Sequence, residues 1–165
     1  MNRYRSNQHN PMLSKHFDLF TLCASETAEA QGWHNLPEAE VIENLRALST
    51  HVLDPLVDHF DLPVNVTSGY RHPRLNREIG GLEASQHILG QAADLMVGGL
   101  TAGYLARWIA ANLPFDELIL EKFDPGSENW GWVHVSYAGA RNRGKISTFD
   151  GRAYHDGLLD LPVVS

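Results

Sequence analysis

The chain has 165 residues, of which 43% are hydrophobic and 20% charged, and its formal net charge is −7. This length and hydrophobic fraction fit one globular domain and exclude a chain that is disordered throughout. The acidic balance weighs against a nucleic-acid-binding protein and against docking on an anionic membrane. Because Cys23 is the only cysteine, the chain can form neither an internal disulfide nor a zinc site of several cysteines.

The two ends of the chain carry few structural signals. Residues 1–20 lack the continuous apolar run of a secretory signal, and no stretch has the ~20 apolar residues of a transmembrane helix. We therefore expect synthesis in the cytoplasm without a signal peptide and no membrane insertion. Residues 1–12 are expected to be a flexible N-terminus, followed by one domain over residues 13–165.

Helix signals dominate the N-terminal half. Ser25 before two nearby glutamates indicates a brief helix start. A longer amphipathic helix is predicted from Pro37 onward, where apolar residues recur at spacings of three and four: Val41, Leu45, Leu48, Val52 and Leu56. Pro55 is expected either to kink this helix or to mark a new first turn.

Strands dominate the remainder. Residues 68–82 are expected to form a turn and a short helix that ends at a glycine pair, and Thr101 is expected to cap a helix over 102–113. Alternating apolar residues predict strands at 63–67, 92–97, 116–123 and 130–137, the last two forming a hairpin. A further strand at 145–149 is left open, and the C-terminal tail is expected to be mostly irregular. The predicted fold is a small α+β domain with a central antiparallel sheet flanked by helices.

Three side chains suggest metal chemistry. Asp94 falls in an apolar run, where a carboxylate is costly unless it is paired or bound to a metal, and His87 lies shortly before it. His134 shares the face of its predicted strand with Trp132 and Ser136. Two histidines and a carboxylate are a common catalytic zinc shell, and the metal lowers the pKa of a water in the open fourth position to roughly 7.

These residues also carry a family resemblance. The segment 85–94 (SQHILGQAAD) resembles the SxHxxGxAxD motif of a zinc peptidase family that contains the D-Ala-D-Ala carboxypeptidases and many phage endolysins. Residues 67–71 (TSGYR) resemble the SGYR turn of that family, and residues 132–136 (WVHVS) its last zinc-ligand strand. The resemblance covers roughly residues 13–137. The segment 13–17 (LSKHF) and the turn near Asn35 are similar to a carboxypeptidase-like subgroup.

The resemblance implies specific roles. His87, Asp94 and His134 would bind Zn²⁺. Arg71 would steady a substrate carbonyl or carboxylate, which suits its planar guanidinium. Ser85 would orient the first ligand. The alternative for each of these two residues is a purely structural place, Arg71 in a surface turn and Ser85 in a turn.

One departure from the family concerns the catalytic base. Many members have a glutamate three residues before the last histidine, where this chain has Gly131. If Phe123 pairs with Trp130, Glu121 lies on the same sheet face as His134, at a diagonal of about 7–8 Å. We therefore predict Glu121 as the general base, and a register shift by one residue would turn it away. The reserve candidates are Glu117 and Glu128.

Several aromatic side chains have two interpretations. They would line a substrate groove, or they would only pack within the sheet and core. They are Tyr70, Trp130, Trp132 and Tyr137.

The leading functional hypothesis is a zinc metallopeptidase that hydrolyses peptidoglycan stem peptides. It would be an endolysin-like L-Ala-D-Glu endopeptidase or a D-Ala-D-Ala carboxypeptidase, with the peptide as its partner and the monomer as the expected state. It would act on the cell wall after release from the cytoplasm, or as a phage-associated protein. The alternatives are a non-catalytic zinc-binding module of a phage structural protein and a metal-dependent nuclease. Whether residues 138–165 cover the site stays open.

Overall fold

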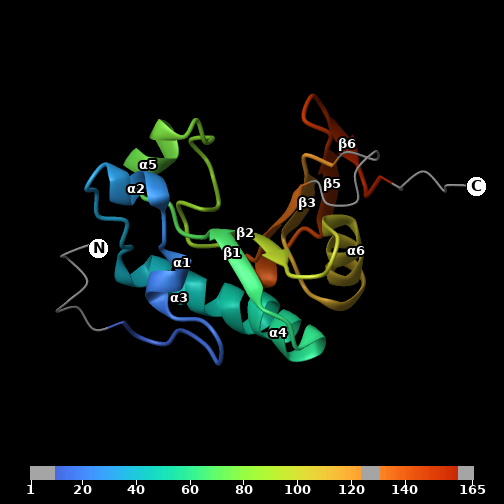
Figure 1. The fold of residues 1–165 in the computed structure, drawn as a ribbon, viewed down its shortest axis with the longest axis horizontal. Helices are drawn as coiled ribbons and strands as arrows, with labels where there is room; N and C mark the ends of the chain where they lie inside the picture. Colours follow the sequence, from blue (N-terminus) through green and yellow to red (C-terminus); the bar gives the residue numbers. More distant parts are fainter. Residues whose placement is uncertain (1–9, 124–130, 160–165) are drawn as a thin grey trace, which may run out of the picture.

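The structure is a computed structural model that describes residues 10–123 and 131–159 (Figure 1). It is an α+β domain, as predicted, with most helices before the sheet in the sequence. The α-helices are α1 Leu19–Leu22, α2 Glu26–Ala30, α3 Ala39–Leu48, α4 Asp54–Phe60, α5 Pro73–Glu78 and α6 Ala102–Asn112. The strands are β1 Val64–Ser68, β2 Ala92–Val97, β3 Glu117–Glu121, β4 Trp132–Ser136, β5 Lys145–Phe149 and β6 Tyr154–Asp156.

Local capping explains where the helices begin. The Ser25 hydroxyl accepts a hydrogen bond from the Ala28 N–H at the start of α2, and Thr101 does the same for Tyr104 at α6. The long helix predicted from Pro37 consists of α3, a π-helical turn at Ser49–Leu53, and α4. Pro55, which lacks an N–H, lies in the first turn of α4 and so marks a new first turn.

The six strands form one sheet in the order β1-β2-β4-β3-β5-β6. Every neighbouring pair is antiparallel except β3 and β5, which run parallel. The strand at 145–149 is therefore confirmed. Strand β6 was not predicted. It is three residues long, too short to show a period, and it follows a turn in which Asp150 accepts hydrogen bonds from the N–H groups of Arg152 and Ala153.

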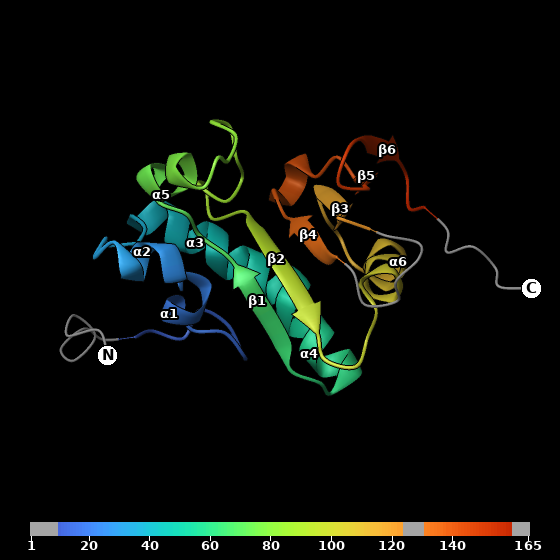
Figure 2. The ribbon, with the colours of Figure 1, turned by 45° about the horizontal axis from the view of Figure 1, so that its top comes forward.

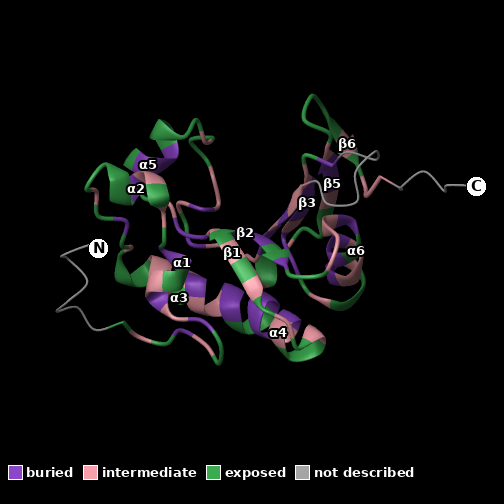
Figure 3. Ribbon diagram, viewed as in Figure 1, coloured by how far each residue is buried: buried purple, intermediate pink, exposed green. Residues whose placement is uncertain are grey.

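The two faces of the central strands differ in chemistry. One face joins a hydrophobic core with residues of α3, α4 and α6, and it carries Ala93, Leu95, Leu118, Leu120, Val133 and Val135. Figure 2 shows α3 and α4 passing behind β1 and β2, with α6 beside β3 and β4, and Figure 3 shows buried residues along the long helix and in the sheet beyond β1. The opposite face presents Asp94, Ile119, Glu121, Trp132 and His134 to a cavity. Period-two alternation thus separates the core from the candidate site.

The predicted flexible N-terminus lies largely outside the described residues, although Met12 forms an isolated bridge with Asp18. Within residues 10–123 and 131–159, no helix combines the length and apolar character that a membrane crossing requires.

Candidate metal centre

Three donor atoms converge at the cavity face of the sheet. Asp94 on β2 is paired directly with His134 on β4, and the loop between α5 and β2 brings in His87. One atom of each side chain lies within 4.8 Å of the others. His134 Nδ1 is 2.9 Å from Asp94 Oδ1, and His87 Nε2 is 3.3 Å from His134 Nδ1 and 3.4 Å from Asp94 Oδ1.

This spacing fits a zinc ion. Tetrahedral zinc with bonds of about 2.0–2.1 Å separates neighbouring nitrogen and oxygen donors by about 3.3 Å. The observed separations of 2.9 to 3.4 Å bracket that value. Two imidazoles and one carboxylate are also a donor set that zinc prefers, and they leave a fourth position for a reacting molecule.

The hydrogen bond behind His87 supports the same conclusion. Its Nδ1 lies 2.7 Å from the carbonyl oxygen of Gly69, which only accepts, so Nδ1 carries the proton. Burial lowers the pKa of His87, which favours the neutral ring with a lone pair on Nε2. That lone pair and the Asp94 carboxylate face one another with no proton between them, and a cation would bridge them.

Asp94 divides its two oxygens between the histidines and an arginine. Burial alone raises the pKa of Asp94, but its interactions with His134 and His87 outweigh burial and hold the pKa below its usual value. Arg71 Nη2 donates to Oδ2 over 2.6 Å, and Arg71 Nε donates to the Ser68 hydroxyl over 2.7 Å. Asp94 is thus held as a carboxylate with Oδ1 turned toward the histidines.

The loop that carries His87 is fixed by local contacts. The Ser85 hydroxyl accepts a hydrogen bond from the His87 backbone N–H over 3.3 Å, which supports an orienting role for this serine. Gly90 then bends the chain with φ +67°, and a Cβ at that position would lie 2.7 Å from Val41. The bend after His87 therefore needs glycine for both its conformation and its packing.

The donor cluster opens into a cavity of about 450 Å³. Four predicted site residues line it besides the three donors: Arg71, Ser85, Glu121 and Trp132. Glu117, a reserve candidate for the base, also lines it, and no role was predicted from the sequence for three other polar lining residues: Gln86, Arg143 and Tyr154. Arg143 and Tyr154 come from the segment after residue 137, which therefore forms one wall of the site. The available signal was a strand pattern at 145–149, which does not reveal its partner.

The register of the hairpin agrees with the prediction. Glu121 lies opposite Trp132, and Ile119 lies opposite His134. Glu121 is half-buried and lines the cavity, and burial raises the pKa of its carboxyl group. Of the reserves, Glu117 is held by Lys145 Nζ over 2.8 Å. Glu128 and the predicted Phe123–Trp130 pairing lie outside the described residues.

The backbone explains why residue 131 is glycine. Gly131 has φ +93°, and a Cβ built there would lie 2.2 Å from the backbone oxygen of Glu121. Any side chain, including the glutamate that many family members carry, would force the two strands apart. The same close approach holds the backbone of Glu121 against the start of β4.

Tyr70 and Ser136, which were expected either to support the metal ligands or to contact the substrate, are both buried. Tyr70 is only 5% exposed, belongs to the hydrophobic core and does not line the cavity. Ser136 is also buried, and its hydroxyl accepts a hydrogen bond from the Glu117 N–H over 3.0 Å. Burial keeps both side chains from direct contact with a substrate, which leaves them the roles of packing and of support behind the cavity. Tyr137 stacks on His51 with ring centroids 4.8 Å apart, which matches the packing alternative.

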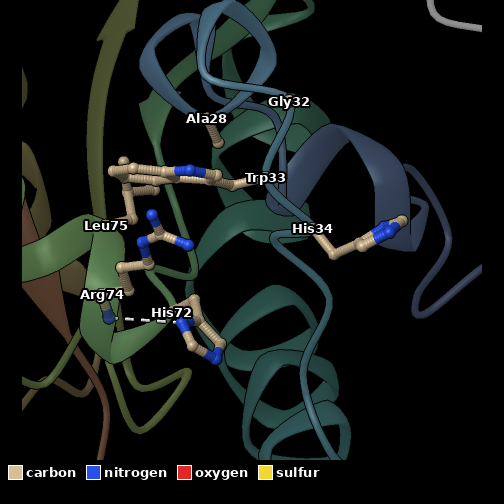
Figure 4. Close-up of a pocket in the computed structure, with 7 residues that line it drawn as sticks. All are labelled: Ala28, Gly32, Trp33, His34, His72, Arg74 and Leu75. Carbon is tan, nitrogen blue, oxygen red and sulfur yellow. Dashed lines mark hydrogen bonds between the residues drawn. The ribbon is translucent and has the colours of Figure 1, made fainter.

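A second cavity, of about 210 Å³, lies near α2 and α5 (Figure 4). Its main feature is the indole of Trp33, with the Arg74 guanidinium 4.0 Å from the ring centroid. None of the three donors lines this cavity. Cys23 lies in the core, where burial raises the pKa of its thiol to about 12, so it does not supply a nucleophile.

Comparison with known families agrees with this geometry. The sequence model of the peptidase M15 family matches residues 15–136, a span that contains all three donors together with Arg71 and Glu121. No curated protein matches the chain. M15 peptidases depend on zinc, and the His-Asp-His cluster described above is placed to bind such an ion. The chain therefore belongs to the peptidase M15 family, the family of the zinc D-Ala-D-Ala carboxypeptidases.

Proposed function

We propose that the protein is a zinc-dependent peptidase that hydrolyses peptide bonds in peptidoglycan stem peptides. Family membership supports the metallopeptidase class. The observation that carries catalysis is the position of Glu121, half-buried in the same cavity and on the same sheet face as the three donors. A glutamate turned to solvent would instead have favoured a binding module.

The residues of the cavity divide the chemistry among them. His87, Asp94 and His134 would hold the zinc ion, which supplies Lewis-acid polarisation of a carbonyl and of the attacking water. Glu121 takes a proton from that water and passes it to the leaving amine, and its raised pKa suits both steps. Arg71, fixed through Asp94 and Ser68, lies where it would steady the developing charge on the substrate.

The bond that is cut is either L-Ala-D-Glu, as in an endolysin-like endopeptidase, or D-Ala-D-Ala, as in a carboxypeptidase. Either bond requires access to the cell wall, after release from the cytoplasm or as part of a phage particle. We propose that the protein acts there as a monomer.

The test is muropeptide release from purified peptidoglycan, followed by mass spectrometry. The reaction is run with the protein as purified, after chelation, and after zinc is restored. We expect fragments that disappear with chelator and return with zinc, and their masses identify the bond. The His87→Ala variant should release none under any condition.

A second candidate, a non-catalytic zinc-binding module, rests on Gly131 at the position of the family's usual glutamate. It predicts one bound zinc per chain and no fragments from any peptidoglycan. Fragment release therefore separates the two candidates, and the zinc content of the same samples shows whether a sample without fragments carries the metal.

A further inference from the structure

One basic residue of the cavity has no role in the chemistry above. Arg143 lies in the loop between the turn at Gly139–Arg141 and β5, beyond the segment that matches the M15 family. It nevertheless lines the same cavity as His87, Asp94 and His134. The parallel pairing of β5 with β3 brings its loop to this wall.

A buried aspartate fixes the orientation of Arg143. Asp116, whose side chain is only 4% exposed, accepts hydrogen bonds from Arg143 Nε over 3.0 Å and from Arg143 Nη2 over 2.7 Å. The backbone N–H of Arg143 donates to the same carboxylate over 2.9 Å. Two-point contact with the guanidinium leaves it little rotational freedom.

The same aspartate connects Arg143 to the metal-binding loop. Gln86, which directly precedes His87, donates from Nε2 to Asp116 Oδ2 over 2.9 Å. The hydrogen bonds of Asp116 therefore set Arg143 in a defined place relative to the metal donors. Asp116 precedes Ile119, the residue opposite His134, by three positions, which corresponds to about 10 Å along an extended strand.

The N–H groups of Arg143 that do not bind Asp116 are accessible to a ligand. The Arg143 side chain is 56% exposed, although Asp116 beneath it is buried. Of its five N–H groups, Asp116 uses one on Nε and one on Nη2, and among the described residues the others have no hydrogen-bond partner. The nearby carboxylate of Glu117 is already paired with Lys145 at 2.8 Å.

We propose that Arg143 binds a carboxylate of the peptide substrate and that Asp116 is the positioning residue that holds it ready. A guanidinium fork fixed at one edge suits planar recognition of a carboxylate at the other. This inference rests on the proposed function. The carboxylate has two possible sources in a wall peptide, the α-carboxylate of D-glutamate and the C-terminal carboxylate.

Paired synthetic stem peptides test this recognition and distinguish the two sources. One pair differs only in whether the D-glutamate α-carboxylate is free or amidated, and the other only in whether the C-terminus is a carboxylate or an amide. kcat and KM are measured for the zinc-loaded wild type, Arg143→Met, Arg143→Lys and Arg141→Met. Arg141 is the matched control, because it is exposed on the same loop and does not line the cavity.

For one of the two pairs we expect the wild type to prefer the free carboxylate. Arg143→Met should lower kcat/KM about tenfold to hundredfold for that peptide, mainly through KM, and leave the amidated peptide unchanged. Arg143→Lys should keep part of the preference because it keeps the charge but loses the fork. Arg141→Met should behave as wild type.

Other outcomes distinguish a failure of the proposed role of Arg143 from a failure of the proposed peptidase function. If Arg143 only stabilises its loop through Asp116, Arg143→Met will lower the melting temperature and reduce activity on both members of each pair equally. That result, or a wild type indifferent to amidation in both pairs, overturns the inference while the proposed function stands. If the zinc-loaded wild type cuts none of the peptides, the proposed function itself fails.

Discussion

Replacing Glu121 with glutamine tests the catalytic base with little disturbance of the fold. The substitution keeps the size of the side chain and removes only its charge and its ability to take a proton. The carboxylate of Glu121 has no hydrogen bond or ion pair with any of the residues in 10–123 and 131–159. We therefore expect the free energy of unfolding to change by less than about 1 kcal/mol.

The expected effect on catalysis is much larger. A positioned general base contributes about 10²- to 10⁴-fold to a rate, which corresponds to about 2.7–5.4 kcal/mol in the activation free energy. Because Glu121 is not one of the three donors of the cluster, Glu121→Gln should retain one zinc per chain. The assay combines kcat on a single muropeptide with zinc content measured by mass spectrometry on the same sample.

Glu117→Gln is the matched control. Glu117 lies on the same strand and lines the same cavity, but its charge is paired with Lys145. We expect its kcat to stay within about threefold of the wild type. A Glu121→Gln variant that keeps wild-type kcat at full zinc occupancy would refute the assignment of the base, and an equal loss in both variants would point to a general effect of cavity charge.

The dependence of activity on pH provides an independent check on Glu121. A general base acts in its ionised form, so activity falls as the pH drops through its pKa. Because burial raises the pKa of Glu121, the acidic limb of kcat/KM should lie above the ordinary range of a glutamate. That limb should disappear in Glu121→Gln.

Three further predictions concern the metal site and the fold. Asp94→Ala should lose zinc and activity together, since it removes a donor and leaves Arg71 unpaired, and measurement of zinc content with kcat checks this. Gly131→Ala should destabilise the fold by about 1–3 kcal/mol more than Gly99→Ala in urea unfolding. Both residues have positive φ, but only at residue 131 would the added Cβ lie 2.2 Å from a backbone oxygen. Asp116→Asn should lower stability at neutral pH by about 1–3 kcal/mol, and the difference from wild type should narrow below about pH 4 in urea unfolding.

The sign of the last prediction follows from the pKa of Asp116. Hydrogen bonds from Arg143 lower this pKa in the folded protein. The carboxylate therefore contributes stability above the pKa of the unfolded chain and loses it as the pH falls through the folded value. A difference in stability between wild type and Asp116→Asn that grew toward acid pH would contradict this reasoning.

Equal destabilisation by Gly131→Ala and Gly99→Ala would show that only backbone conformation matters at residue 131.

The sequence was sufficient for those features that depend on neighbours along the chain. Alternation with a period of two assigned His134 to one face of its strand, and the parity of the predicted hairpin placed Glu121 on that face. The two strands follow one another in the sequence and were predicted to pair as a hairpin, and the predicted pairing of Ile119 with His134 is confirmed. The motif at 85–94 supplied His87, whose place next to Asp94 periodicity alone does not give.

Other features depend on segments that meet only in the folded protein. The Gly69 carbonyl fixes the tautomer of His87 from 18 positions away, and the parallel pairing of β5 with β3 brings Arg143 to the cavity. Tyr70 is a second example, because its place within the SGYR-like turn left both a groove and a packing role open, and only the fold shows that the core encloses it. A local pattern determines which face a side chain takes, but not which distant segment lies against that face. The sequence thus determined the fold class and the three candidate metal donors, whereas tertiary packing decided the proton on His87, the need for glycine at residue 131 and the place of Arg143 at the cavity.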